Sequence, residues 1–222
     1  MMLYSTRKLK KIALYVSDEE VGRIERLFID TAKWDVRYLL LLKSDLISSR
    51  RLLITTPSMK DVTFIKNKIH LRSQDQLARA TPIEVSIEKS HPEDLIQVKT
   101  NLPVFKSQGT YSTLMDTEKL KGYPIRADDG TRGFLTELAI DLVGWSVRYV
   151  IVKKNKWQFW RKTLIPPLWV DSVNTSTGNI NVNLPKSAIE KAPELNNIAG
   201  ITPRLERRVV FHYGSDKFKH HT

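Results

Sequence analysis

Cysteine is absent from the 222-residue chain. Its absence excludes a disulfide framework, a thiol nucleophile, and zinc or iron–sulfur sites built on thiolates. Long apolar runs are also missing, because the longest, from Tyr38 to Leu42, is far shorter than the roughly 20 residues that span a bilayer. The basic N-terminal stretch lacks the apolar segment of a signal peptide. We therefore expect a cytoplasmic protein, either free or peripheral to a membrane.

Acidic residues are too few to balance the basic ones. The chain has 36 Lys and Arg against 24 Asp and Glu, which gives a net charge of +12. This excess favours an anionic partner, namely nucleic acid, an acidic membrane surface or an acidic protein. The alternative is a basic surface that serves solubility alone. With 41% hydrophobic residues the chain has enough apolar side chains for a packed core.

One pentapeptide occurs twice with a single change: WDVRY at 34–38 and WSVRY at 145–149. The same offset of 111 positions aligns further residues on both sides, without a gap, from Leu9 with Leu120 to Pro82 with Pro193. Such a match indicates two copies of one domain. We assign domain 1 to 1–84, a linker to 85–113, domain 2 to 114–195, and a basic C-terminal tail, expected to be partly mobile, to 196–222.

The second copy reads as a series of short strands with turn residues between them. Its apolar positions Leu135, Leu138 and Ile140 do not alternate strictly, which predicts a bulge that bends the strand. Pro166 and Pro167 predict a sheet edge or a corner, since proline cannot donate to a ladder. The stretch 173–184 predicts a hairpin, and 185–192 a short helix that begins at proline. This pattern predicts an all-β fold, favouring a small barrel over a sandwich.

The ordered motifs resemble the PRC-barrel domain family, and both copies carry them. In the second copy they are KLKGYPI, DDGTRGFLTELAID, WSVRYVIV, WQFWRKTLIPPLWV and a final APEL. The family includes the cytoplasmic domain of the photosynthetic reaction centre H subunit and the C-terminal domain of a bacterial ribosome-maturation factor. The first copy departs from the pattern at Lys11, Glu19 and Thr55–Thr56.

The resemblance implies two tandem small PRC-like β-barrels, each of about six strands with a short C-terminal helix. It also implies a non-enzymatic module that docks onto a larger assembly and carries no cofactor. The residues agree with this, because the chain has no phosphate loop, HExxH or GxSxG motif. The five histidines form no metal-binding pattern apart from the adjacent His220 and His221, which we interpret as part of the tail.

The repeated pentapeptide predicts a structural signature rather than a catalytic site. Arginine inside an apolar strand needs a partner, and an aspartate precedes each turn by a few residues. We therefore expect an Asp–Arg pair capped by tryptophan in each copy. The signature comprises Asp30, Trp34, Arg37, Tyr38, Asp141, Trp145, Arg148 and Tyr149.

The stretch KKNKWQFWRK, residues 153–162, is the strongest candidate for a contact with a partner. Basic and aromatic side chains together are used by single-stranded nucleic acid binders, by membrane-surface anchors and by protein hot spots. A structural alternative is that one of these aromatics packs on the barrel. The candidate residues are Lys153, Lys154, Lys156, Trp157, Phe159, Trp160, Arg161 and Lys162.

These observations predict a non-enzymatic cytoplasmic adaptor that docks onto a protein assembly. Two alternatives remain open. The first is an RNA- or ribosome-associated factor of the maturation type, whose partner would be RNA or a ribosomal protein. The second is a membrane-peripheral module, related to photosynthetic or electron-transfer complexes, that binds an anionic membrane surface.

Overall fold

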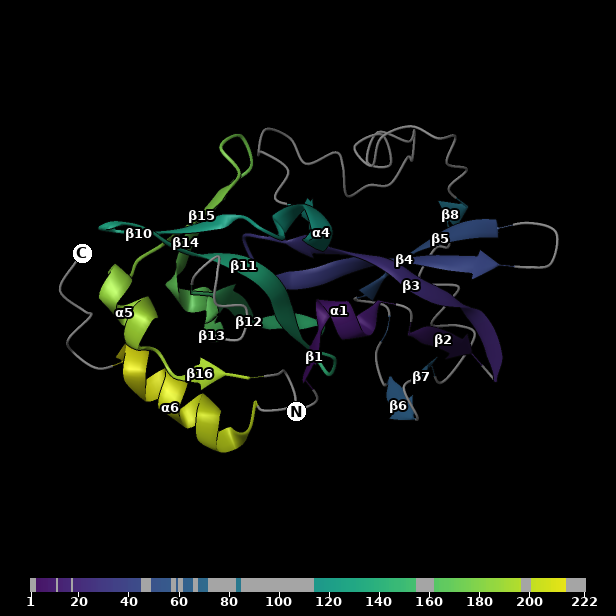
Figure 1. The fold of residues 1–222 in the computed structure, drawn as a ribbon. Helices are drawn as coiled ribbons and strands as arrows, with labels where there is room; N and C mark the ends of the chain where they lie inside the picture. Colours follow the sequence, from purple (N-terminus) through teal and green to yellow (C-terminus); the bar gives the residue numbers. More distant parts are fainter. Residues whose placement is uncertain are drawn as a thin grey trace. The chain divides into compact units, whose positions relative to one another are not determined.

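The computed structural model describes residues 3–10, 12–16, 18–44, 49–56, 59, 62–65, 68–71, 83–84, 114–154, 162–196 and 201–214. These residues divide into two compact units. Unit 1 takes those within 1–9, 31–35 and 115–222, and unit 2 takes those within 10–30 and 36–114. The chain is mostly β, as expected, with a few short helices (Figure 1). The expected linker, 85–113, lies outside the described residues.

Unit 1 is built on a long bent strand, β11 (Gly130–Asp141), that pairs along its length with β12. On its other side β11 pairs first with β10, at Gly130 to Phe134, and then with β1, at Ala139 to Asp141. The strand order is β14–β15–β10–β11–β12–β13–β16. The remaining bounds are β1 (Leu3–Ser5), β10 (Pro124–Ala127), β12 (Ser146–Lys153), β13 (Lys162–Ile165), β14 (Val170–Asn174), β15 (Asn179–Val182) and β16 (Glu194–Leu195).

Short helices complete unit 1. Four-residue turns of helix follow the first strand of each copy, and Ser5 and Asp116 cap them by accepting from the backbone N–H groups of Lys8 and Glu118. The short helix predicted after Pro185 is confirmed as α5. The helices are α1 (Thr6–Leu9), α4 (Thr117–Leu120), η3 (Pro167–Trp169), α5 (Lys186–Lys191) and α6 (Pro203–Gly214).

Unit 2 repeats this strand order. Its path is β6–β7–β2–β3–β4–β5–β8, and the parallel pair β2/β7 aligns Leu14 with Ile69 as β10/β15 aligns Ile125 with Ile180. The secondary structure therefore recurs at the 111-residue offset of the sequence. The bounds are β2 (Ala13–Val16), β3 (Glu19–Asp30), β4 (Asp35–Ser44), β5 (Ser49–Thr55), β6 (Thr63–Ile65), β7 (Lys68–Leu71) and β8 (Ile83–Glu84); β9 (Leu114–Asp116) begins in unit 2 and ends in unit 1.

Local features of the second copy agree with the sequence. The register of β11 against β12 shifts between Leu135 and Glu137, so the predicted bulge is confirmed. Pro167 begins η3 between β13 and β14, which confirms the predicted corner. The predicted hairpin is β14–β15. The strand pairings described form an open series in each unit, so the structure shows extensive β-sheet without showing closed barrels.

The C-terminal stretch, expected to be partly mobile, contains a helix that we did not predict from the sequence. Residues 203–214 form α6, which buries Leu205, Val209 and Tyr213. These side chains are spaced by four residues and therefore share one helix face. The ring of Tyr213 lies 6.3 Å from that of Trp169, so α6 is packed against unit 1. Residues 215–222 lie outside the described residues.

The units do not coincide with the contiguous copies expected from the sequence. The first copy's β1 and α1 belong to unit 1, where β1 pairs with β11 of the second copy (Figure 1). Thr6 Oγ1 accepts a hydrogen bond from Leu138 N at 3.3 Å, and Leu9 is fully buried. Leu114, which starts the second copy, belongs to unit 2 and packs against a cluster of Phe28, Tyr38 and Leu40. The opening segment of the first copy is thus incorporated into the unit formed by the second.

We predict that Thr6→Val lowers the free energy of unfolding of unit 1 by about 1 kcal/mol, because it leaves the buried Leu138 N–H without an acceptor. Urea denaturation followed by tryptophan fluorescence measures the change. Thr117→Val is the matched control, because the Thr117 hydroxyl is buried without a hydrogen-bond partner among the described residues. We expect this variant to keep the stability of the wild type. Equal destabilisation by the two variants would contradict the incorporation of residues 3–9.

A second prediction concerns Gly133, where β11 lies close to β12. Its φ is +87°, and a Cβ would lie 2.6 Å from Lys153 O and 2.8 Å from Val152 Cγ1. We expect Gly133→Ala to destabilise the protein by more than about 1 kcal/mol, because both the left-handed backbone and the close approach resist a side chain. Gly144→Ala is the control, since the nearest atom there is 3.8 Å away. Thermal melting of the two variants should separate them clearly.

Candidate functional site

The repeated pentapeptides form turns whose tryptophans have an unusual backbone. Trp34 and Trp145 have φ values of 57° and 52°, and both side chains are buried. Left-handed backbone in a large residue is strained and persists only where packing holds it. Within unit 1, Val147 N donates to Trp34 O at 2.6 Å. The backbone of the first tryptophan turn is therefore held by the second pentapeptide within unit 1.

Asp141 and Arg148 do not form the buried pair expected from the sequence. The carboxylate of Asp141 accepts a hydrogen bond from Val143 N at 3.2 Å and so supports the turn. The side chain of Arg148 is 54% exposed, and its Nε lies 3.7 Å from Glu206 Oε1. The premise of a buried arginine is wrong here because β12 turns Arg148 outward and the Glu206 of α6 supplies the carboxylate.

Tyr149 makes the stronger contact with the same carboxylate. Its hydroxyl donates to Glu206 Oε1 at 2.8 Å, while its ring is buried. Burial, followed by this hydrogen bond, raises the pKa of Tyr149 to about 12. Glu206 is thus the polar contact that joins α6 to β12. We did not predict this contact from the sequence, although the four-residue spacing of Leu205, Val209 and Tyr213 indicates the helix that carries Glu206.

Of the first copy's signature residues, Asp30, Arg37 and Tyr38 belong to unit 2, whereas Trp34 belongs to unit 1. Tyr38 is buried with Phe28 and Leu40, and this burial raises its pKa. Asp30 ends β3, and Arg37 is half-buried in β4. The expected pairing of these two residues stays a prediction.

The candidate stretch 153–162 is described only at its two ends. Lys153 ends β12, where it pairs in register with Lys162 of β13. The residues between 155 and 161, which include Lys156, Trp157, Phe159, Trp160 and Arg161, lie outside the described residues.

Lys154 must be removed from the set of surface contacts. Its side chain is buried, and its Nζ donates to Glu190 O at 2.7 Å and to Ala192 O at 2.9 Å. These carbonyls lie at the C-terminal end of α5, where a cation is favourable. The role of Lys154 is therefore to hold α5, and its ammonium group is not presented to a partner.

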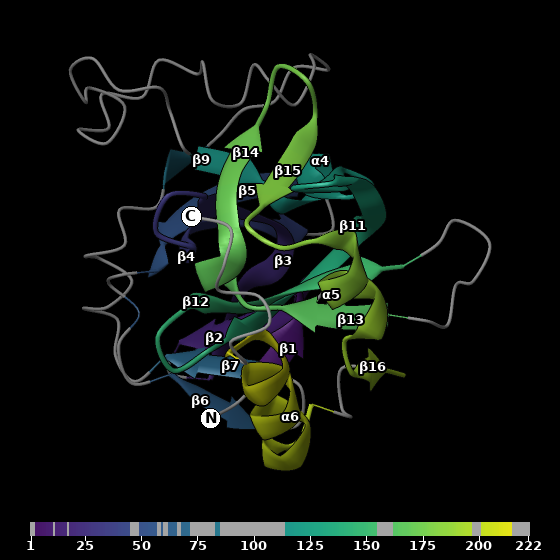
Figure 2. The same cartoon turned by 90° about the vertical axis from the view of Figure 1, so that its left-hand side faces the viewer.

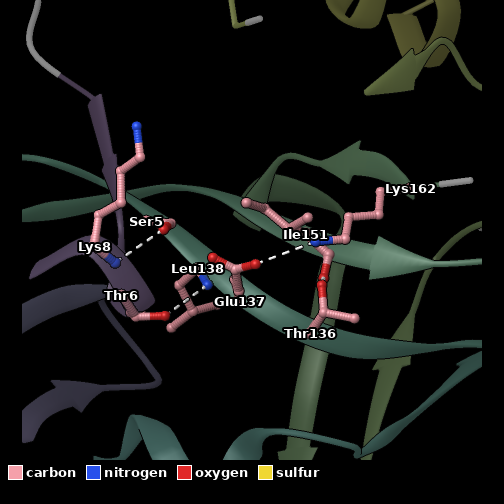
Figure 3. Close-up of polar contacts among 8 residues, drawn as sticks. All are labelled: Ser5, Thr6, Lys8, Thr136, Glu137, Leu138, Ile151 and Lys162. Atoms are coloured by element: carbon pink, nitrogen blue, oxygen red, sulfur yellow. Dashed lines mark hydrogen bonds and ion pairs between the residues drawn. The ribbon is translucent and has the colours of Figure 1, made fainter. Parts of the chain in front are cut away.

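Lys162, at the other end of the stretch, lines a pocket of about 200 Å³ in unit 1. Its Nζ lies 3.2 Å from Glu137 Oε1, and the two side chains are 24% and 15% exposed (Figure 3). The first copy's segment forms another part of the lining, at Ser5, Arg7 and Lys8. Ile151, Leu195 and Asn196 complete it. The pocket thus exists only because residues 3–9 belong to unit 1.

The polar groups around this pocket are held by a network of hydrogen bonds. Ser5 Oγ accepts from Lys8 N at 3.2 Å, while Thr136, beside Glu137 on β11, donates to Ile151 O at 3.0 Å (Figure 3). These contacts fix the backbone that carries Lys8, Glu137 and Ile151. The pocket is therefore a defined cavity between strands and α1.

The charges around the pocket favour an anion. Among the described residues, Arg7, Lys8 and Lys162 are the cationic residues that line it, and Glu137, which is paired with Lys162, is the carboxylate. A volume of about 200 Å³ is smaller than the roughly 300–1,000 Å³ of common small-molecule sites. The pocket accordingly suits one carboxylate or phosphate group rather than a whole nucleotide.

The described residues offer no group of His, Asp and Glu side chains arranged to hold a metal ion. His212 instead contacts Ala188 O through Nε2 at 2.7 Å, which links α6 to α5. Within the same described ranges, no helix has the length and apolarity needed to cross a bilayer.

No protein-family model matches the chain, and no curated protein matches it.

We predict that Tyr149 makes stability depend on alkaline pH. Because its folded pKa is raised from 10.0 to about 12, the neutral hydroxyl contributes stability fully below pH 10, and this contribution is lost as pH rises through about 12. The free energy of unfolding should fall over that range more steeply for the wild type than for Tyr149→Phe. Urea denaturation at pH 8, 10 and 11 measures the difference. Parallel curves for the two proteins would contradict the contact with Glu206.

Proposed function

We propose that the chain is a non-enzymatic adaptor that docks onto a larger assembly through an anionic group of its partner. The observation that carries the proposal is the pocket in unit 1, which is lined by Arg7, Lys8 and Lys162, with Lys162 paired with Glu137. We propose that the pocket accepts one acidic group and that the basic and aromatic stretch 153–162, which ends at Lys162, contacts the same partner.

The electrostatics of the described residues support binding over proton-transfer chemistry. The groups with a shifted pKa are four tyrosines and Arg51, and each pKa is raised away from neutrality. A general acid or base works best with a pKa near the working pH. Glu137, the carboxylate among the described residues that line the pocket, is already paired with Lys162.

The architecture that we propose for this adaptor is two tandem PRC-like barrels. Three features support it: the ordered motifs in both copies, the equal strand orders of the two units, and the strongly bent β11 with its two register shifts. Modules of this family dock onto protein or ribonucleoprotein assemblies, which agrees with a basic binding site. Fold by itself does not select the partner.

A defined acidic probe tests the proposal. We expect fluorescein-labelled hexaglutamate to bind the full chain and raise its fluorescence anisotropy at 50 mM salt, and to be released as salt is raised. Arg7→Gln combined with Lys8→Gln should weaken this binding at least fivefold, because two of the three pocket cations are lost. Lys121→Gln combined with Arg126→Gln removes the same charge from exposed positions elsewhere in unit 1 and serves as the control.

A labelled oligouridine in the same assay distinguishes the RNA alternative. If the oligouridine binds, its affinity falls steeply with salt, and hexaglutamate does not compete, the RNA-associated function replaces the one proposed here. If neither probe binds, or if the pocket and control variants weaken hexaglutamate equally, the pocket is not the docking site.

A further inference from the structure

The outward face of α6 combines arginine with exposed apolar side chains. The inward face is occupied by Leu205, Val209 and Tyr213, whose burial fixes the orientation of the helix on unit 1. The opposite face is exposed to solvent, and α6 lies on the outside of unit 1 next to α5 (Figures 1 and 2). That face carries Arg204, Arg207, Arg208, Val210 and Phe211.

The apolar members of this face are unusually accessible. Phe211 is 79% exposed and Val210 is 61% exposed. Large apolar side chains gathered in one region of a surface usually indicate contact with a partner or a membrane.

The charge of this face has one sign. Phe211 lies four residues after Arg207 and three after Arg208, so all three side chains are neighbours on the helix surface. Glu206 is the acidic residue of α6, but its side chain is 14% exposed and is bound by Tyr149 and Arg148. The outward face of the helix therefore presents arginine without a compensating carboxylate among the described residues of α6.

Arginine around a central aromatic residue, with an aliphatic residue beside it, matches the chemistry of an anionic lipid surface. Guanidinium groups pair with lipid phosphates, while Phe211 and Val210 can enter the boundary between headgroups and acyl chains. Single-stranded nucleic acid would use Phe211 for stacking, but it offers no apolar environment for Val210. The exposed aliphatic side chain of Val210 thus favours the bilayer over RNA.

We propose that the outward face of α6 is a docking surface for an anionic membrane. In this arrangement α6 lies parallel to the bilayer, with its arginines at the phosphates and Phe211 between them. The surface lies on different residues from the pocket of Arg7, Lys8 and Lys162, and the proposal does not depend on an acidic group binding there.

Vesicle flotation with the full chain tests this surface. We expect the protein to float with vesicles of phosphatidylcholine containing 30% phosphatidylserine and to remain unbound with pure phosphatidylcholine. Arg204→Gln combined with Arg208→Gln should weaken partition tenfold or more, since one basic residue near an anionic surface contributes on the order of fivefold. Phe211→Ser should also weaken it, and this residue is exposed enough for the fold to tolerate the change.

Two controls separate this surface from general charge and from the pocket. Lys121→Gln with Arg126→Gln removes equal charge at other exposed positions, and Arg7→Gln with Lys8→Gln alters the pocket. Both should float nearly as well as the wild type, and circular dichroism checks that every variant is folded. Loss of flotation confined to the α6 variants supports the proposal. Absence of flotation, or an equal loss in all arginine and lysine variants, overturns it.

Discussion

The pairing of residues 3–9 with β11 is the constraint on which the candidate site depends. Thr6 accepts a hydrogen bond from Leu138 N, β1 pairs with the end of β11, and Leu9 is fully buried. Ser5, Arg7 and Lys8 are brought to the same pocket as Glu137 and Lys162 by this pairing. Had the segment remained with its own copy, the cations of the pocket would have come from elsewhere in the chain. The stability of unit 1 and the charge of its pocket are therefore linked through one short segment.

The second organising contact is the attachment of α6. Apolar burial of Leu205, Val209 and Tyr213 supplies most of the favourable free energy, because large side chains are removed from water. Glu206 further fixes the orientation of α6, since its carboxylate is bound by Tyr149 and lies near Arg148. Because the inward face of α6 is buried against the rest of unit 1, Arg207 and Phe211 point to solvent. The proposed membrane surface is thus a consequence of how the helix is anchored.

The two proposed surfaces use the excess of positive charge in different ways. The pocket concentrates Arg7, Lys8 and Lys162 around a space for one acidic group, whereas α6 spreads its arginines along an exposed face with Phe211 among them. A confined site suits a single carboxylate or phosphate, and an extended face suits a charged plane. An adaptor with both could join an acidic protein to a membrane. Lys154 shows that not every basic residue serves binding, because it is buried at the end of α5.

The sequence by itself determined the repeat, the mostly β character and several local features. Pro166 and Pro167 indicated the corner, the spacing of Leu135 and Leu138 indicated the bulge, and both were found. These features depend on backbone properties of a few neighbouring residues, which sequence patterns express directly. The choice of which of two equivalent strands a segment pairs with cannot be predicted from local patterns. Because the two copies are alike, local patterns cannot say whether residues 3–9 pair with β3 or β11, or whether Arg148 meets Asp141 or Glu206. Only the tertiary structure decided those contacts, since they join residues far apart in the chain.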